Sequence, residues 1–331
     1  MGTLKKPLIY KRNLSDTGCT IVNNLITNPI PCVSYVGETD MVYFNNTILK
    51  PSKYTPTPDT GSTPDTGSTP DTGSTPDTGE TPDEKYDEMY LAFKALGSGN
   101  FSWNSHTINY SLDGGETWQP LNNSSISVNE GDVVMWKASG LSTSDSTHGI
   151  GTFSSTCAYE VYGNILSLVN NGEFTIEKEL KDSYFASLFS GSTTLVSAEN
   201  LVLPENFYSK KKVLYGMFTK CTSLVKAPKL PASTLAQECY RNMFAGCTSL
   251  VTAPELLADT LVNQCYRGMF SGCTSLNYIK CLATYVKASS CTDGWTTGVS
   301  NTGTFIKAHI DSDDWDSGES GIPENWGVME Q

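Results

Sequence analysis

Cysteine is the residue type whose spacing in this sequence comes closest to that of a chemical site. Ten cysteines are present, and seven of them lie between Cys221 and Cys291. Thiolates bind zinc from pairs such as C-x-x-C, but no such pair occurs. Six of the seven instead recur at a fixed interval of 26 residues. Each position has a counterpart one interval away, so we expect buried thiols that pack as small hydrophobic groups, rather than zinc ligands or disulfides.

Carboxylates and histidines offer a calcium site or an acid–base centre as further possibilities. Residues 311–318 hold four aspartates, but Trp315 stands at the fifth position, where an EF-hand loop needs a ligand, so a solvated acidic loop is favoured. The three histidines, His106, His148 and His309, have no ligand spacing. Phosphate loops, nucleophile elbows and glycosidase contexts are absent as well. We therefore expect no catalytic residue, no metal and no cofactor.

Residues 111–118, Ser-Leu-Asp-Gly-Gly-Glu-Thr-Trp, match the Asp-box pattern of sialidase propellers. In that family the box is a structural hairpin turn that lies away from the chemistry. A single box in about 100 residues does not make a propeller. We expect the Asp113 side chain to cap backbone amides of the turn, while glycine supplies the positive φ.

Tryptophan is the side chain most suited to sugar binding, because its ring face stacks on the C–H face of a sugar. The alternative for each tryptophan is burial in a core or a cap, and this alternative is favoured. Basic residues at variable positions of the repeats, such as Lys226 and Arg241, are expected on a solvated face. The tryptophan candidates are Trp103, Trp118, Trp295 and Trp315.

From about residue 183 the sequence repeats itself. The segment Met-Phe-x-x-Cys-Thr-Ser-Leu recurs three times, and a weaker copy ends at Leu195. A fixed period of 20–30 residues indicates a solenoid, in which equivalent side chains stack in continuous ladders. The atypical tail after Cys281, which includes Trp295 and Trp326, is predicted to cap the stack. The predicted repeat core consists of Phe218, Phe244, Phe270, Leu224, Leu250, Leu276, Cys221, Cys247 and Cys273.

The chain is predicted to be mainly β and to have four segments. Residues 1–50 form a small β-rich anchor whose apolar runs include Met41-Val-Tyr-Phe44, and residues 51–83 repeat Thr-Pro-Asp-Thr-Gly-Ser as an extended linker that would reach on the order of 100 Å. Residues 84–182 are predicted to be an Ig-like or sandwich-like β domain, because runs such as 91–95 and 133–136 have strand character. Residues 183–331 form the predicted solenoid and its cap.

The charge distribution suggests that the two ends meet different partners. The net charge of −13 argues against a nucleic-acid partner, and no apolar stretch reaches the ~20 residues of a membrane helix. The N-terminal tip is basic, whereas the residues from Asp311 onward contain only acidic charges. Anchoring to a particle is assigned to Leu8, Ile9, Tyr10, Lys11, Arg12, Val33 and Tyr35.

The repeat units resemble the BspA-like leucine-rich repeats of Bacteroidales proteins and their phages. The tail, through Trp295-Thr-Thr-Gly, Trp315 and Ser-Gly-Ile-Pro-Glu-Asn-Trp326, is similar to the ending of that group, and residues 88–182 resemble its β domain. The resemblance covers roughly residues 88–331 and does not extend to residues 1–50. Bacterial members of the group are exported adhesins, but the start of this chain does not read as a secretory signal.

The resemblance therefore implies a head-fibre or tail-fibre protein of a crAss-like phage, assembled in the host cytoplasm and carried on the virion surface. Its expected partners are a capsid or tail protein at residues 1–50 and a bacterial surface glycan or protein at the C-terminal domains. We expect a homo-oligomer, for which a trimer is one possibility, without membrane insertion. The alternatives are a cell-surface adhesin and, less favoured, a glycan-degrading enzyme.

Overall fold

The chain divides into two units, Met1–Ser74 and Thr75–Gln331. In the first unit, strand β1 (Val42–Phe44) pairs antiparallel with β2 (Thr47–Leu49), which confirms the strand predicted over 41–44. The molecule is known from a computed structural model, which describes residues 42–44, 47–49, 86–143, 149–172, 174, 180–207, 209–309 and 315–331.

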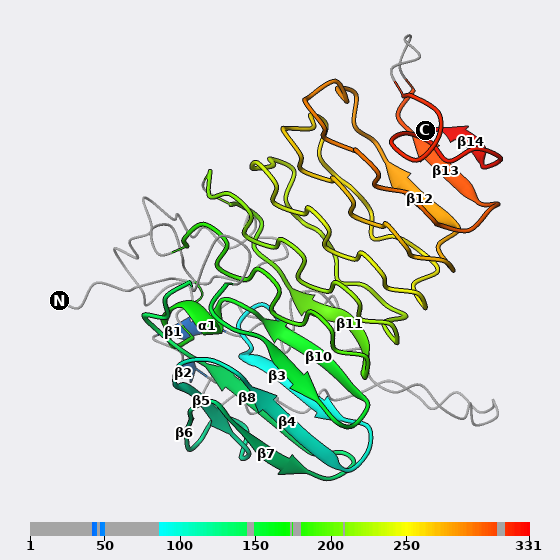
Figure 1. The fold of residues 1–331 in the computed structure, drawn as a ribbon. Helices are drawn as coiled ribbons and strands as arrows, with labels where there is room; N and C mark the ends of the chain where they lie inside the picture. The colour runs from blue at the N-terminus through cyan, green and yellow to red at the C-terminus, as the bar shows by residue number, and fades with distance from the viewer. Residues whose placement is uncertain are drawn as a thin grey trace, which may run out of the picture. The chain divides into compact units, whose positions relative to one another are not determined.

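The second unit begins with two sheets, and the described residues are mainly β, with one four-residue helix, α1 (Ser167–Asn170). The larger sheet has the order β11-β10-β3-β8-β5-β6, and the smaller has the order β7-β4-β9 (Figure 1). The strands of the larger sheet are β3 (Leu91–Ala95), β5 (Ile108–Ser111), β6 (Gln119–Leu121), β8 (Val133–Lys137), β10 (Tyr159–Asn164) and β11 (Leu195–Val202). The strands of the smaller sheet are β4 (Gly99–Trp103), β7 (Ser124–Val128) and β9 (Phe153–Ser155).

An aromatic core joins these two sheets. The alternation of buried and partly buried residues in β8 turns Val134 and Trp136 inward, as the period of two predicts. The ring of Phe93 in β3 lies 5.4 Å from that of Phe101 in β4, at 88°, and 4.8 Å from that of Phe153 in β9. These edge-to-face contacts place aromatic side chains of both sheets in one layer between them.

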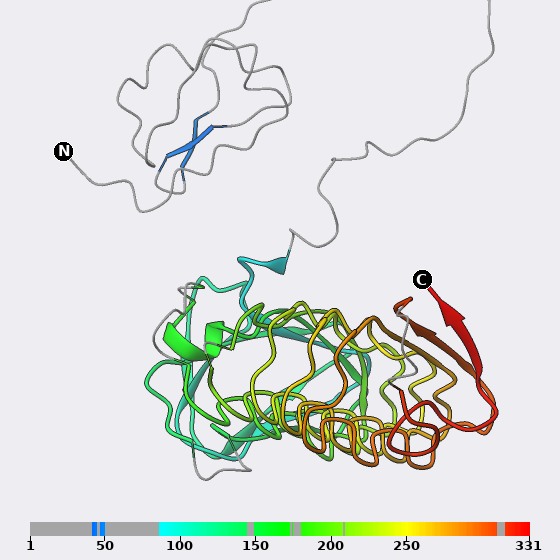
Figure 2. The same cartoon turned by 90° about the horizontal axis from the view of Figure 1, so that it is seen from above.

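From about residue 183 the chain runs in successive coils that lie side by side (Figures 1 and 2). Hydrogen bonds join each coil to the next at an almost constant offset. The amide of Phe218 donates to the carbonyl of Met243 at 2.8 Å, and the amide of Phe244 donates to that of Met269 at 2.9 Å. Bonds of this offset recur at every second residue along this side, so alternate backbone amides are satisfied by the next coil.

Within each coil the backbone makes a series of tight turns. The amide of Met217 donates to the carbonyl of Leu214, and that of Cys221 to Phe218. In each of these coils three residues, spaced four apart, have φ between 52° and 77°, a conformation that glycine adopts at no steric cost. These residues recur at equal intervals as Lys212, Glu238, Gln264 and Ser290, as Gly216, Asn242, Gly268 and Gly294, and as Lys220, Gly246, Gly272 and Gly298.

The other side of the stack is built from parallel pairings. Near the C-terminal end these become a three-stranded parallel sheet of β12 (Tyr278–Cys281), β13 (Thr304–Lys307) and β14 (Gly327–Glu330). On this side the earlier coils are joined by isolated parallel bridges, such as the one between Leu230 and Leu256. The side chains of Ile279 and Phe305 lie in register and are fully buried, so this sheet closes one side of the apolar interior.

The two sheets and the coils share one interior. Strand β11, which opens the predicted repeat region, pairs parallel with β10 of the preceding sheet. The Phe189 ring lies 5.8 Å from Phe93 on one side and 5.4 Å from Phe218 on the other. Described residues on both sides of the predicted boundary between residues 182 and 183 therefore belong to one hydrophobic core.

Candidate functional site

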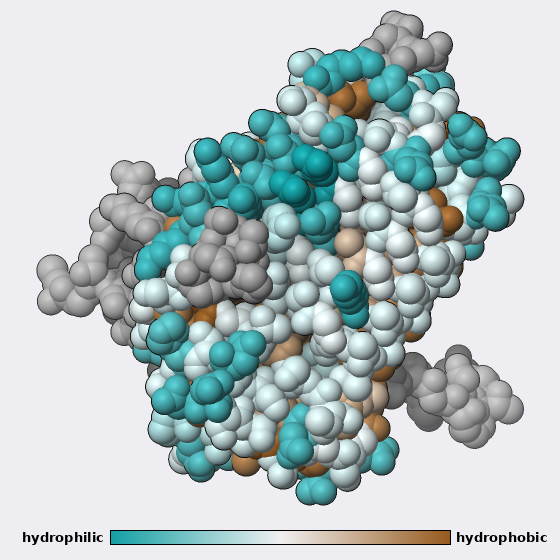
Figure 3. Space-filling view, viewed as in Figure 1, coloured by the Kyte–Doolittle hydropathy of each residue, from teal (hydrophilic) through white to brown (hydrophobic). Residues whose placement is uncertain are grey.

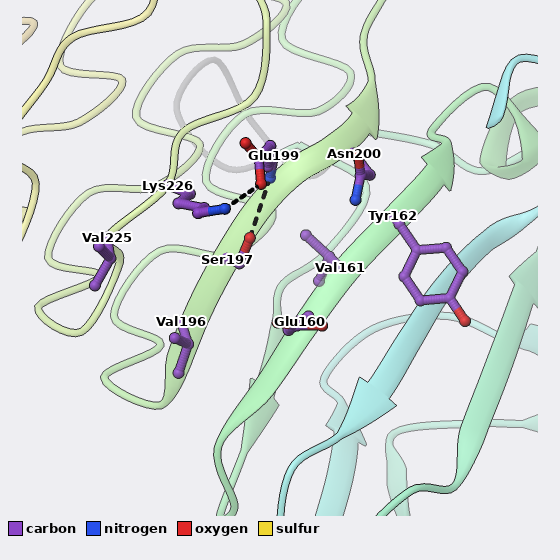
Figure 4. Close-up of a pocket in the computed structure, with 9 residues that line it drawn as sticks. All are labelled: Glu160, Val161, Tyr162, Val196, Ser197, Glu199, Asn200, Val225 and Lys226. Atoms are coloured by element: carbon purple, nitrogen blue, oxygen red, sulfur yellow. Dashed lines mark hydrogen bonds and ion pairs between the residues drawn. The ribbon is translucent and has the colours of Figure 1, made fainter. Parts of the chain in front are cut away.

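A surface groove of about 260 Å³ lies where β10, β11 and the next coil meet (Figure 4). The Tyr162 side chain lies toward one end of it, and Val225 and Lys226 lie toward the other. Between them the groove is lined by Val161 and Val196 and by the polar side chains of Glu160, Ser197, Glu199 and Asn200. The volume is slightly below the usual range for pockets that bind drug-sized molecules, so it suits a small group.

The groove forms because the parallel pairing of β10 with β11 is irregular. Tyr159 faces Leu195, but Glu160 faces Ser197 and Tyr162 faces Asn200, so the register shifts twice within four residues. Such bulges unpair residues locally and redirect their side chains. Lys226 continues the sheet on the far side, since its carbonyl accepts a hydrogen bond from the amide of Ala198 at 2.9 Å.

One ion pair crosses the groove. The Lys226 ammonium donates to the Glu199 carboxylate at 2.6 Å, and this hydrogen bond raises the pKa of Lys226. Both side chains are more than half exposed, so the pair contributes little to stability and each group keeps further bonding capacity. The amide of Glu199 also donates to the Ser197 hydroxyl oxygen at 3.4 Å.

The remaining polar groups are open. Among the described residues, neither the Glu160 carboxylate nor the Asn200 side-chain amide has a hydrogen-bond partner. The Tyr162 ring contacts Tyr86 edge to face at 5.8 Å, and its partial burial raises the pKa of Tyr162. The groove thus presents carboxylate acceptors, an amide that donates and accepts, and aliphatic surface to a ligand.

The Asp-box segment forms the predicted turn. Asp113 accepts from the Thr117 hydroxyl and amide, the latter at 2.9 Å, and Ser111 Oγ donates to Asp113 at 2.7 Å. The hydrogen bonds from Thr117 contribute most to a pKa of about 2 for Asp113. Gly114 and Gly115 have φ values of 75° and 95°, as expected. The carboxylate is engaged in holding the turn, which confirms its structural role.

The four tryptophans considered for sugar binding pack against the protein itself. Trp103 and Trp295 are buried, and their indole N–H groups donate to the carbonyls of His106 and Gly321. Trp118 is half-buried beneath Lys137, whose ammonium lies 4.1 Å from the ring centre. Trp315 stacks on Trp295 at 5.5 Å, as expected of the predicted cap.

The residues assigned to the repeat core are buried together. Its three phenylalanines lie in a column, with ring centres 5.5 Å apart for Phe218 and Phe244 and 5.9 Å apart for Phe244 and Phe270. The thiol of Cys247 donates to the carbonyl of Phe218 at 3.1 Å, and that of Cys273 to Phe244 at 3.0 Å. All nine predicted core residues have no exposed surface: Phe218, Phe244, Phe270, Leu224, Leu250, Leu276, Cys221, Cys247 and Cys273.

Burial also decides the chemistry of the thiols. It raises the pKa of Cys221 and of Cys273 to about 12, so the nucleophilic thiolate is disfavoured. All eight cysteines in the described part of the chain are buried free thiols. Across the same part, no group of three or more histidine, cysteine, aspartate or glutamate side chains is arranged to hold a metal ion.

Several predicted groups fall outside the described residues. They include His148, the aspartates of 311–314 and all of the proposed anchoring residues, which are Leu8, Ile9, Tyr10, Lys11, Arg12, Val33 and Tyr35. Of the two described histidines, His309 contacts the Glu330 carboxylate at 2.7 Å, and His106 contacts Ser105 at 3.1 Å. The structure therefore does not bring these histidines together with the groove.

Sequence reasoning did not identify the groove. The available signal is the run Tyr159-Glu-Val-Tyr162, whose alternation predicts a strand with Glu160 and Tyr162 on one face. The partner strand β11 carries no recognisable motif, and a double register shift leaves no trace in residue type. Lys226 was expected on a solvated face, which the structure confirms.

Comparisons of the chain with known protein families, curated proteins and solved structures gave no match. None of the helical segments within the described ranges has the length and apolar character to span a bilayer.

Proposed function

We propose that the chain is a non-enzymatic attachment protein of a virion surface, with a β-sandwich-like domain over residues 84–182 and a leucine-rich-repeat solenoid over residues 183–331. The phenylalanine column is the observation that supports this proposal. Phe218, Phe244 and Phe270 stack within 6° of parallel, so one interior is copied from coil to coil. Solenoids of this kind provide extended surfaces for binding partners.

The outward positions of the same coils vary while the interior is constant. The second position after the core leucine is Lys226 in one coil, Thr252 in the next and Tyr278 in the third. On the face seen in Figure 3, apolar colour occurs in small separate patches within a polar and weakly polar surface. A constant core with a varied polar exterior suits recognition of a polar surface better than burial in a permanent interface.

In this proposal the parts of the chain have separate tasks. Residues 1–50 bind a phage capsid or tail protein, and residues 51–83 act as an extended spacer. The two C-terminal domains contact a bacterial surface glycan or protein, and a homo-oligomer would add avidity to contacts that are individually weak.

A fusion of residues 1–50 to a fluorescent reporter tests the anchor directly. We expect it to bind phage particles that lack the full protein, and a fusion of residues 51–83 serves as the control. Gold-labelled antibodies against the full chain should mark particles and leave uninfected cells of the encoding strain unlabelled. Labelling of uninfected cell surfaces, together with no binding of the fusion to particles, would instead support the adhesin alternative.

A further inference from the structure

We propose that the groove between β10, β11 and the coil at Lys226 is a binding site for one neutral sugar residue of a bacterial surface glycan. The inference rests on the proposed function and specifies its ligand-binding site. It starts from the two register shifts, which turn side chains of both strands toward one hollow at the junction of sheet and coils.

The polar lining matches the groups that a sugar ring offers. Glu160 and Asn200 are without hydrogen-bond partners among the described residues, and they come from neighbouring strands. A carboxylate accepts from hydroxyls, while an amide both donates and accepts, so the two side chains can read adjacent hydroxyl groups. The Ser197 hydroxyl and the Lys226–Glu199 pair add further donors and acceptors at the rim.

The apolar lining matches the C–H face of the same ring. Val225 is 50% exposed, and Val196 lies beside it, because the amide of Val225 donates to the carbonyl of Val196 at 2.9 Å. Val196 and Val225 together give the groove an aliphatic wall (Figure 4), and the buried side chain of Val161 lies beneath its floor. A volume of about 260 Å³ admits a single small ring-sized group and leaves the rest of a glycan in solvent.

Charge selects a neutral sugar over an acidic one. The groove contains two carboxylates, Glu160 and Glu199, and the one ammonium group, from Lys226, is already paired with Glu199. The chain as a whole has a net charge of −13. Lys94 lies opposite Glu160 on β3 but is not among the residues that line the groove, so an acidic sugar inside the groove would meet two carboxylates and one ammonium that is already paired.

The test uses the full-length chain and saturation-transfer NMR. The probes are the methyl glycosides of glucose, galactose, mannose and N-acetylglucosamine, with glucuronic acid and N-acetylneuraminic acid as acidic sugars, each at about 10 mM because a single-ring site binds weakly. We expect transfer to at least one neutral glycoside and none to the acidic sugars.

Two substitutions on different strands locate the binding. Glu160→Gln and Asn200→Ala should each lower the affinity for the glycoside by about tenfold, since each removes a hydrogen bond to the ligand. Neither should change the melting temperature, because neither side chain has a hydrogen-bond partner in the described structure. Glu130→Gln is the matched control, because the exposed Glu130 also has no hydrogen-bond partner among the described residues but lies outside the groove.

Three outcomes would overturn the assignment: no transfer to any neutral glycoside, preference for the acidic sugars, or transfer that both groove variants leave unchanged. Binding of the labelled full chain to host cells separates this inference from the proposed function. If the chain binds cells and the groove binds no glycoside, the groove assignment is wrong and the attachment function stands. If the groove binds a glycoside but the chain does not bind cells, the attachment function fails instead.

Discussion

Truncation of Phe244 to alanine gives the most direct test of the stacked interior. The ring is fully buried and lies between two others, 5.5 Å from Phe218 and 5.9 Å from Phe270, with interplanar angles of 2° and 6°. Aromatic side chains bury at least roughly 150 Å², which at ~25 cal/mol per Å² amounts to about 4 kcal/mol. The flanking rings are held by their own coils and cannot collapse into the space.

We therefore expect Phe244→Ala to lower the free energy of unfolding by about 4 kcal/mol, within the range of roughly 3–5 kcal/mol for phenylalanine truncations in cores. For a unit of this size the melting temperature should fall by roughly 10 °C. Urea unfolding followed by circular dichroism measures the first quantity, and calorimetry measures the second. The matched control is Val251→Ala in the same coil, since Val251 is 43% exposed and its truncation should cost under about 0.5 kcal/mol.

The reasoning would be refuted if Phe244→Ala lost no more stability than Val251→Ala. A double substitution of Phe218 and Phe244 adds a second check. Because the two rings touch, their combined loss should differ from the sum of the single losses by about 0.5–1.5 kcal/mol. Additive losses would indicate that the rings lie in separate environments rather than in one column.

Three further predictions concern the turns, the Asp-box and the shared core. Ser290 and Gly294 have φ values of 52° and 59°, which glycine adopts without strain. In urea titrations Ser290→Gly should therefore raise the free energy of unfolding and Gly294→Ala should lower it, each by about 1 kcal/mol. If both substitutions changed the free energy of unfolding in the same direction, the strain argument would be wrong. The pKa of Asp113 is lowered from 3.8 to about 2 by its hydrogen bonds from Thr117. The stabilisation that the ionised Asp113 gives the fold should be complete above about pH 4 and be lost as the pH falls toward 2. The unfolding midpoints of the wild type and of Asp113→Asn should therefore converge over that interval. A difference between the two midpoints that does not change with pH would exclude this linkage. A fragment of residues 183–331 should give the circular dichroism spectrum of an unfolded chain, because it exposes the Phe189 end of the column and the edge of β11. A cooperative thermal transition of this fragment would contradict a shared core.

The interior of the coils was predictable from sequence because it is periodic. Positions 26 residues apart share one environment, so identical residues such as Phe218 and Phe244 mark the column without any structure. The weaker copy at Phe189 also joins the column, although its spacing is longer by three residues, because the extra residues leave the ring contact intact.

Two features were not predictable in this way. Lys212, Glu238 and Gln264 adopt left-handed backbone angles that their residue types disfavour, because hydrogen bonds to the neighbouring coils impose them. The pairing of β10 with β11 joins strands that are separated by about 30 residues and crosses the predicted boundary at residue 182. The groove depends on the irregular register of that pairing, so the sequence did not predict it either.

The constant offset between coils has a consequence for how such a protein can change over generations. A duplication of one 26-residue unit would insert a rung whose donors and acceptors already match those of its neighbours. Each added rung would lengthen the stack by about 4.8 Å, the separation of paired strands, and leave both ends as they were. Unequal recombination within the gene could thus change the length of the stack of coils without changing the residues at either of its ends.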